Sequence, residues 1–174
     1  MKRYHSPGEA LQAARDPTTT AEELRVLATS IFDFVQLAVT EHPNTEPDVL
    51  LALLPSVIES WNEQQRADAI ARHSQTPTAA FRLLAERLPP ILNRGRNHQF
   101  GLRAGITFCC NPNTPIDDIE MLLRDTRVSS DFRQMLVREV TRLEVLHFLA
   151  TDRSSVVQKR AQSRLQELNN TRND

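Results

Sequence analysis

Apolar residues along the chain recur three and four positions apart, which is the spacing of a helix face. In the segment IFDFVQLAVTEH, for example, Phe34, Val35, Ala38 and Val39 follow this period. A half-buried strand would instead alternate between apolar and polar residues, and no stretch does so convincingly. The pattern therefore predicts an all-α protein made of short helices.

A helix-start motif recurs along the chain and divides it into units. Each copy has a polar residue, usually a proline, a threonine at the fourth position and then an apolar i, i+3 pair. The copies begin at Asp16, His42, His73 and Asn111, and a fifth copy, EVLHFLATD, lacks the proline start. The pairs are Leu24/Leu27, Leu50/Leu53, Phe81/Leu84, Ile119/Leu122 and Leu146/Leu149. Such repetition predicts an α-solenoid of about five stacked helix pairs.

The threonine of each copy fits a helix N-cap, because its hydroxyl can accept a hydrogen bond from an amide group of the first turn. We therefore expect N-caps at Thr19, Thr45, Thr76 and Thr114. A proline directly follows two of these threonines, at the first helical position, where a missing amide hydrogen matters least.

The chain of 174 residues is long enough for one domain with one continuous core. We expect a single helical-repeat domain over 1–174, with units starting near 16, 42, 73, 111 and 139. The widest spacing between units holds an insertion at 88–99, which we expect to project from the helices or fold over them. Residues 169–174 are expected to form a short disordered tail.

Two phrases of the sequence, LAVTEHPNTEPDVLLALL and ITFCCNPNTPIDDIEMLL, resemble the repeat of the leucine-rich repeat variant family. The resemblance covers roughly residues 10–152. It implies a right-handed helical superhelix, and the longer unit spacings imply full second helices, as in HEAT-like pairs. Some family members carry an iron–sulfur cluster in a cysteine-rich N-terminal segment. No such segment occurs in this sequence, so we expect no cluster.

Composition and motifs argue against catalysis. Only 4 glycines occur, which argues against phosphate-cradling loops, and no GxSxG, P-loop, HExxH or dinucleotide motif is present. The net charge is −1, without the global basic field of a dedicated DNA-binding protein. The charge is uneven, because residues 1–90 hold 8 Lys+Arg against 12 Asp+Glu, whereas residues 91–174 hold 13 against 10. We expect no enzyme and no cofactor.

Both cysteines, Cys109 and Cys110, are adjacent at the expected end of a helix. Neighbouring Cα atoms are about 3.8 Å apart, which is shorter than the usual disulfide range of about 4.4–6.8 Å. Aligned copies have Thr40 and Ala71 in place of Cys109, so the position does not need sulfur. We interpret both cysteines as small helix-end residues, with a redox or metal role as the alternative.

The histidines and paired carboxylates also have structural interpretations. His42 and His73 occupy the position that Asp16 and Asn111 fill in other copies, so we assign them to a turn rather than to a metal. Acidic residues in first helical turns favour the positive end of the helix dipole. The acidic pairs are Glu22/Glu23 and Asp117/Asp118, and we assign no catalytic residue and no metal ligand.

A basic cluster near the insertion is the candidate contact site for an anion or partner. Arg94, Arg96, His98 and Arg103 fall within ten residues. One interpretation is a solvated connector, and the other is a patch for an acidic protein surface or a phosphate, serving partner contact rather than the core. Trp61, the single tryptophan, is either a core plug or an interface anchor.

The expected function is binding of another protein by a non-catalytic helical-repeat module, through its solenoid surface. The alternative is binding of a nucleic-acid phosphate backbone through the more basic C-terminal half. No apolar run approaches the roughly 20 residues that span a bilayer, and the first residues lack an apolar signal-peptide core. We therefore expect a cytoplasmic location and no membrane partner, and no small-molecule substrate is evident.

Overall fold

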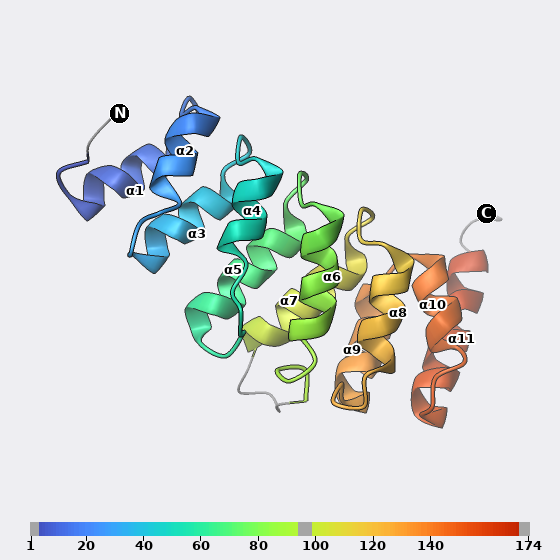
Figure 1. The fold of residues 1–174 in the computed structure, drawn as a ribbon. Helices are drawn as coiled ribbons and strands as arrows, with labels where there is room; N and C mark the ends of the chain where they lie inside the picture. Colours follow the sequence, from blue (N-terminus) through green and yellow to red (C-terminus); the bar gives the residue numbers. More distant parts are fainter. Residues whose placement is uncertain (1–3, 94–98, 171–174) are drawn as a thin grey trace.

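The computed structural model describes residues 4–93 and 99–170 (Figure 1). Within these ranges the chain forms eleven α-helices and no strand, which confirms the all-α prediction. The odd-numbered helices are α1 (Pro7–Arg15), α3 (Asp33–Glu41), α5 (Trp61–Arg72), α7 (Gln99–Cys110), α9 (Ser130–Glu139) and α11 (Ser155–Asn170). The even-numbered helices are α2 (Ala21–Leu27), α4 (Pro47–Leu53), α6 (Thr78–Arg87), α8 (Ile116–Arg124) and α10 (Leu143–Leu149).

The helices pack mainly on neighbours that are close in the sequence. Each odd-numbered helix packs on the next odd-numbered one, from α1 to α11, and the even-numbered helices do the same from α4 to α10. Helix α2 packs on α1 and α3. The first and last helices consequently lie at opposite ends of an elongated molecule (Figure 1).

The apolar pairs of the motif form the inner face of the even-numbered helices. Residues three apart on a helix share one face, so burial of both members was expected. The least buried of the ten, Leu53, is only 7% exposed, and Leu24, Leu50, Leu84 and Ile119 are at 0%. The predicted core positions of all five copies are confirmed.

The even-numbered helices begin later than predicted, so the N-cap assignment of the four threonines is wrong. The non-helical residue directly before each of these four helices is the one after the threonine. Only the first of these caps closes a capping box, in which Thr20 and Glu23 exchange hydrogen bonds. The N-caps are Thr20, Glu46, Pro77 and Pro115.

Thr19, Thr45 and Thr114 are buried and Thr76 is half-buried, and three of these four fourth-position threonines bond backward to the end of the preceding helix. Their hydroxyls donate to the carbonyl six residues earlier, which also accepts a hydrogen bond from the amide of the residue directly after the helix. The pairs are Thr19 Oγ1 to Ala13 O (2.6 Å), Thr45 Oγ1 to Val39 O (2.5 Å) and Thr76 Oγ1 to Ile70 O (2.5 Å). The hydroxyl of Thr114 is buried without a hydrogen-bond partner among the described residues.

The first part of the predicted insertion belongs to the core. Leu88, Ile91 and Leu92 are each 0% exposed. The amide and hydroxyl of Ser129 both donate to the carbonyl of Leu92, at 3.3 and 2.8 Å. The expectation that the insertion serves partner contact rather than the core is therefore wrong for 88–92, because its apolar side chains fill space beside α7 and α9.

Two glycines let α7 lie close to this segment. A Cβ on Gly101 would stand 2.9 Å from Ile91 Cδ1, and a Cβ on Gly105 would stand 2.8 Å from Leu92 Cδ2 and 2.9 Å from the Phe132 ring. Such distances are shorter than carbon–carbon contact allows, so only glycine fits without movement.

The C-terminal helix is longer than predicted. Helix α11 continues to Asn170, so residues 169 and 170 are helical and not part of a tail. The remainder of the predicted tail, 171–174, lies outside the described residues.

Candidate protein-binding surface

Exposed large apolar side chains are concentrated in one part of the chain. Among the described residues, six of the seven lie between positions 31 and 61, and the seventh is Val156. The most exposed are Ile31 (88%), Val57 (55%) and Trp61 (55%). We call the group Ile31, Phe32, Phe34, Val57 and Trp61 the aromatic edge. Its members lie at the starts of α3 and α5 and in the loops before them.

Two aromatic side chains at the start of α3 lie at the border of its buried face. Val35, Ala38 and Val39 fill that face, and Phe34, one turn before Ala38, lies at its edge and is 47% exposed. The rings of Phe32 and Phe34 pack on each other with centroids 5.5 Å apart. Two aromatic side chains thus cover each other while keeping part of their surface in solvent.

The start of α5 is held by a capping box directly before Trp61. Ser60 Oγ accepts from the Glu63 amide at 3.3 Å, and Glu63 Oε2 accepts from the Ser60 amide at 2.6 Å. Hydrogen bonds from the amides of Ser60 and Glu59 to this carboxylate lower the pKa of Glu63 below its ordinary value. With Ser60 as the N-cap, Trp61 is the first residue of the helix and lies in its first turn.

A polar contact joins the first turns of the two helices of the aromatic edge. Asn62 Nδ2 donates to Asp33 Oδ2 at 2.8 Å, and Arg66 Nη1 lies 3.4 Å from the other Asp33 oxygen. Residues 29 positions apart in the sequence are therefore adjacent at the starts of α3 and α5.

Two hollows flank the loop between α2 and α3, and both are lined in part by Thr29. One, of about 390 Å³, lies among α2, α3, α4 and α5 and includes Arg66 and Leu54. The other, of about 570 Å³, lies toward α1 and includes Phe32 and Tyr4. The aromatic edge is thus bordered by concave surface that protruding side chains of a partner could enter.

Arg103 is the one member of the predicted contact cluster that lies within the described residues; Arg94, Arg96 and His98 lie outside them. Arg103 Nε is 3.2 Å from Asp68 Oδ2, and Arg72 Nη2 is 2.5 Å from the same oxygen. Thr107 Oγ1 donates to the second oxygen of Asp68 at 2.6 Å. One buried carboxylate thereby holds two half-exposed guanidinium groups, and α5 and α7 are linked by charge.

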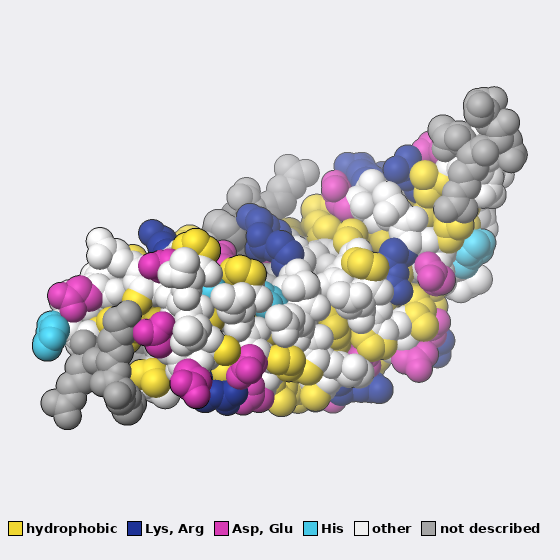
Figure 2. All heavy atoms as spheres, turned by 90° about the horizontal axis from the view of Figure 1, so that it is seen from above, with side chains coloured by type: hydrophobic (Ala, Val, Ile, Leu, Met, Phe, Trp, Pro, Cys, Tyr) yellow, Lys and Arg dark blue, Asp and Glu magenta, His cyan; other side chains and the backbone are white. Residues whose placement is uncertain are grey.

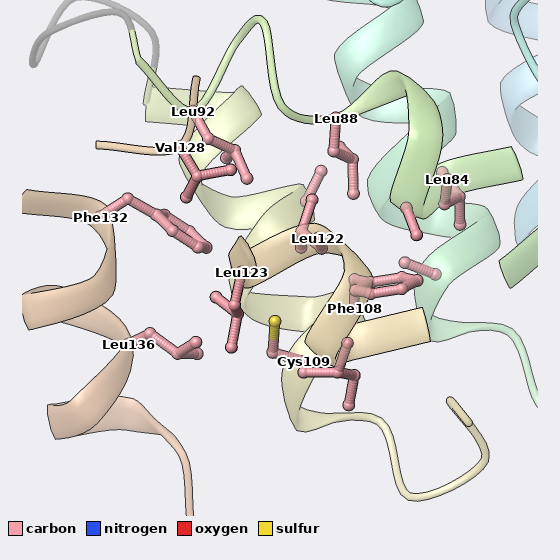
Figure 3. Packing of buried hydrophobic residues seen from close by; sticks show 14 of the residues in the cluster. Leu84, Leu88, Leu92, Phe108, Cys109, Leu122, Leu123, Val128, Phe132 and Leu136 are labelled. Atoms are coloured by element: carbon pink, nitrogen blue, oxygen red, sulfur yellow. The ribbon is translucent and has the colours of Figure 1, made fainter. Parts of the chain in front are cut away.

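The two adjacent cysteines differ in burial, because Cys109 lies in the core and Cys110 is half-buried. Cys109 is 0% exposed, and Figure 3 shows its sulfur among apolar side chains beside Leu123. Burial raises the pKa of the Cys109 thiol well above its ordinary value, and burial also raises that of the half-buried Cys110. Both are free thiols. A protonated thiol is a poor nucleophile and a poor metal ligand, so the surroundings oppose redox or metal chemistry.

The two turn histidines link successive units. His42 Nδ1 accepts from the amide of Asn44 at 3.1 Å, so the other ring nitrogen, Nε2, carries the proton and donates to Asp16 O at 2.9 Å. His73 repeats the arrangement, with Nε2 3.0 Å from His42 O. Both rings have two partners already. Among the residues that the structure describes, no three His, Cys, Asp or Glu side chains are grouped so that they could hold a metal ion.

The paired carboxylates lie in first helical turns, as the sequence indicates. Asp118 is buried, and its desolvation raises its pKa although Arg82 Nε lies only 3.0 Å away. Glu23 is engaged in the capping box with Thr20. Neither pair of carboxylates lines either of the two hollows that flank the loop between α2 and α3.

The aromatic edge was largely missed by sequence reasoning. Of its members only Trp61 was a candidate contact residue, and its 55% exposure shows that the core-plug alternative is wrong. Phe34 was predicted on the apolar face of its helix, and it is instead 47% exposed. A usable signal did exist, because Ile31 and Phe32 precede a helix whose apolar face is already complete without them.

No protein-family model, no curated protein and no solved structure matches this chain. Within the described ranges, none of the helices is both long enough and apolar enough to cross a membrane.

Proposed function

We propose that this chain is a non-catalytic helical module that binds another protein through the aromatic edge. The observation that carries the proposal is the concentration of exposed apolar side chains in residues 31–61. Single exposed apolar residues are common on soluble proteins, whereas several near one another mark an interaction surface. The Asn62–Asp33 hydrogen bond brings the starts of α3 and α5 together. Tryptophan and phenylalanine are also enriched at the centres of protein interfaces.

The aromatic edge is held in place by secondary structure and by a hydrogen bond, which favours binding. Phe34 and Trp61 lie in helices, and Asn62 joins the starts of these two helices through its hydrogen bond to Asp33. Because a rigid surface loses little conformational freedom on association, more of the contact energy remains as affinity. Asp33 and Arg66 provide charged groups beside the apolar centre, as in the polar rim of an interface.

We also propose that the helices form a right-handed α-solenoid of about five units, as the resemblance to the leucine-rich repeat variant family implies. The ordered packing of odd-numbered helices on one another and the recurring buried pairs support this arrangement. Stacked units give a long surface on which a partner can contact several helices at once. The cytoplasmic location expected from the sequence remains a prediction.

The charge distribution on one face favours binding of a protein over binding of a nucleic acid along the whole length of the molecule. On the face shown in Figure 2, acidic, basic and apolar side chains are interspersed. A continuous basic stripe along that face would have favoured a phosphate backbone.

Affinity capture from the native host, comparing two matched variants, tests the proposal. Val57→Ser removes a 55% exposed valine of the aromatic edge, and Val156→Ser removes a 47% exposed valine far from it. Exposed substitutions usually change stability by less than about 0.5 kcal/mol, so both variants should stay folded. We expect a protein that the unmodified chain captures, with or without nuclease treatment, to be lost with Val57→Ser and kept with Val156→Ser.

Titration of that purified protein against both variants makes the comparison quantitative. Equal affinity for Val57→Ser, Val156→Ser and the unmodified chain would exclude the aromatic edge as the binding surface.

A further inference from the structure

A basic groove lies between α9 and α11, toward the opposite end of the molecule from the aromatic edge. Its volume is about 490 Å³, and its floor includes Val137, which is 3% exposed. Its walls are formed by Arg138, Lys159, Arg160, Ser163, Arg164 and Glu167. Four cationic side chains therefore share the groove with one carboxylate.

Most of this positive charge is not neutralised by the protein. Arg138, Lys159 and Arg160 are exposed and make no ion pair within the described ranges. The carboxylate of Glu167 lies 3.0 Å from Arg164 Nη1, so the single acid of the groove is already engaged. Arg164 also has a buried Nε without a hydrogen-bond partner in the described structure.

The positively charged residues of α11 all lie on the side of the helix that lines the groove. On α11 the lining residues Lys159, Arg160, Ser163 and Arg164 are spaced i, i+1, i+4 and i+5, which places them on one side of the helix. Arg138 extends the groove from α9. An extended anion lying in the groove can therefore contact cations from two helices.

We propose that this groove binds the phosphate backbone of a nucleic acid. Guanidinium and ammonium groups bind phosphate through charge-assisted hydrogen bonds, and Ser163 adds a hydroxyl donor. No aromatic side chain lines the groove, so stacking on bases does not contribute. Contacts of this kind position a backbone without reading its sequence, and binding should be sequence-independent. The site is separate from the aromatic edge.

An anisotropy titration of the full chain with labelled nucleic acid tests the proposal. Short duplex and single-stranded probes of unrelated sequence are titrated between roughly 50 and 200 mM salt. We expect both to bind at the low end, with an association constant that falls linearly on logarithmic axes as salt rises. Arg160→Gln should reduce that slope by about 0.9 for the duplex or about 0.7 for the single strand. A slope change with only one probe identifies which form of the backbone fits the groove.

Arg15→Gln provides the matched control. Arg15 is an exposed arginine at the end of α1, so this variant loses the same charge at the other end of the molecule. It should bind as the unmodified chain does, and so should Val57→Ser, which affects only the aromatic edge. Circular dichroism establishes that each variant is folded.

Three results would overturn the assignment. These are no binding at low salt, equal weakening by Arg15→Gln and Arg160→Gln, or competition by polyglutamate as effective as that by unlabelled nucleic acid. The last result would make the groove a carboxylate-binding site for an acidic protein segment.

Discussion

Two fourth-position threonines of the motif, Thr45 and Thr114, are equally buried but differ in their hydrogen bonds. Thr45 is 0% exposed and donates to Val39 O, whereas Thr114 is 1% exposed and its hydroxyl has no partner among the described residues. A buried hydroxyl without a partner loses its hydration without compensation, whereas a bonded one retains its interaction.

This difference predicts unequal effects of the same isosteric substitution. Thr45→Val should lower the free energy of unfolding by about 1 kcal/mol, because the buried hydrogen bond from the Thr45 hydroxyl to the Val39 carbonyl is lost and only the His42 amide still donates to that carbonyl. Thr114→Val should be neutral or stabilising, since it removes an unsatisfied hydroxyl. Urea denaturation with the midpoint and slope measured for each variant tests this, and equal losses would contradict the assigned bonding.

At the scale of elements, the packing of α7 depends on the absence of a side chain at two positions. The closest approach involves Gly105, where an added Cβ would meet Leu92 and Phe132. By contrast, an added Cβ on Gly8 in α1 would have Ser6 Oγ, at 3.8 Å, as its nearest neighbour. The two glycines are both helical, so they differ mainly in available space.

Gly105→Ala should therefore destabilise the protein by about 1–3 kcal/mol, the usual effect of overpacking a core. Gly8→Ala should leave stability unchanged or raise it by up to about 1 kcal/mol, because alanine favours the helix. Thermal unfolding followed by circular dichroism measures both. A neutral Gly105→Ala variant would mean that α7 lies farther from α9 than the structure indicates.

At the scale of the whole molecule, the buried apolar residues form two clusters that meet at α4. The smaller, from α1 to α4, contains no buried aromatic ring among the described residues. The larger, from α4 to α11, contains Phe81, Phe108 and Phe132. Leu50 belongs to the larger cluster and Val49 to the smaller one, so α4 contributes to both.

The two clusters predict unequal local stability. Segments that bury less apolar surface open with a lower free energy, so amides of α1–α3 should exchange with solvent faster than those of α5–α9. Native-state hydrogen exchange read by mass spectrometry measures this difference. Equal protection throughout would show that both clusters unfold as one cooperative unit.

The sequence by itself determined the positions of the helices and the apolar faces that they bury. Leu24/Leu27 and its four counterparts were identified because helical spacing and turn residues are local properties. The helix starts were misplaced by one residue, because Thr19 and Thr20 are both suitable caps and only burial of Thr19 separates them.

Only the tertiary structure decided which side chains are covered. Leu92 is buried because Ser129, Phe132 and α7 meet it, and Trp61 is exposed because no described element lies over it fully. The two parts of the aromatic edge come together because α3 packs on α5, where Asn62 reaches Asp33 from 29 residues away. Burial depends on such distant neighbours, whose positions follow from the packing of whole helices and not from the local pattern.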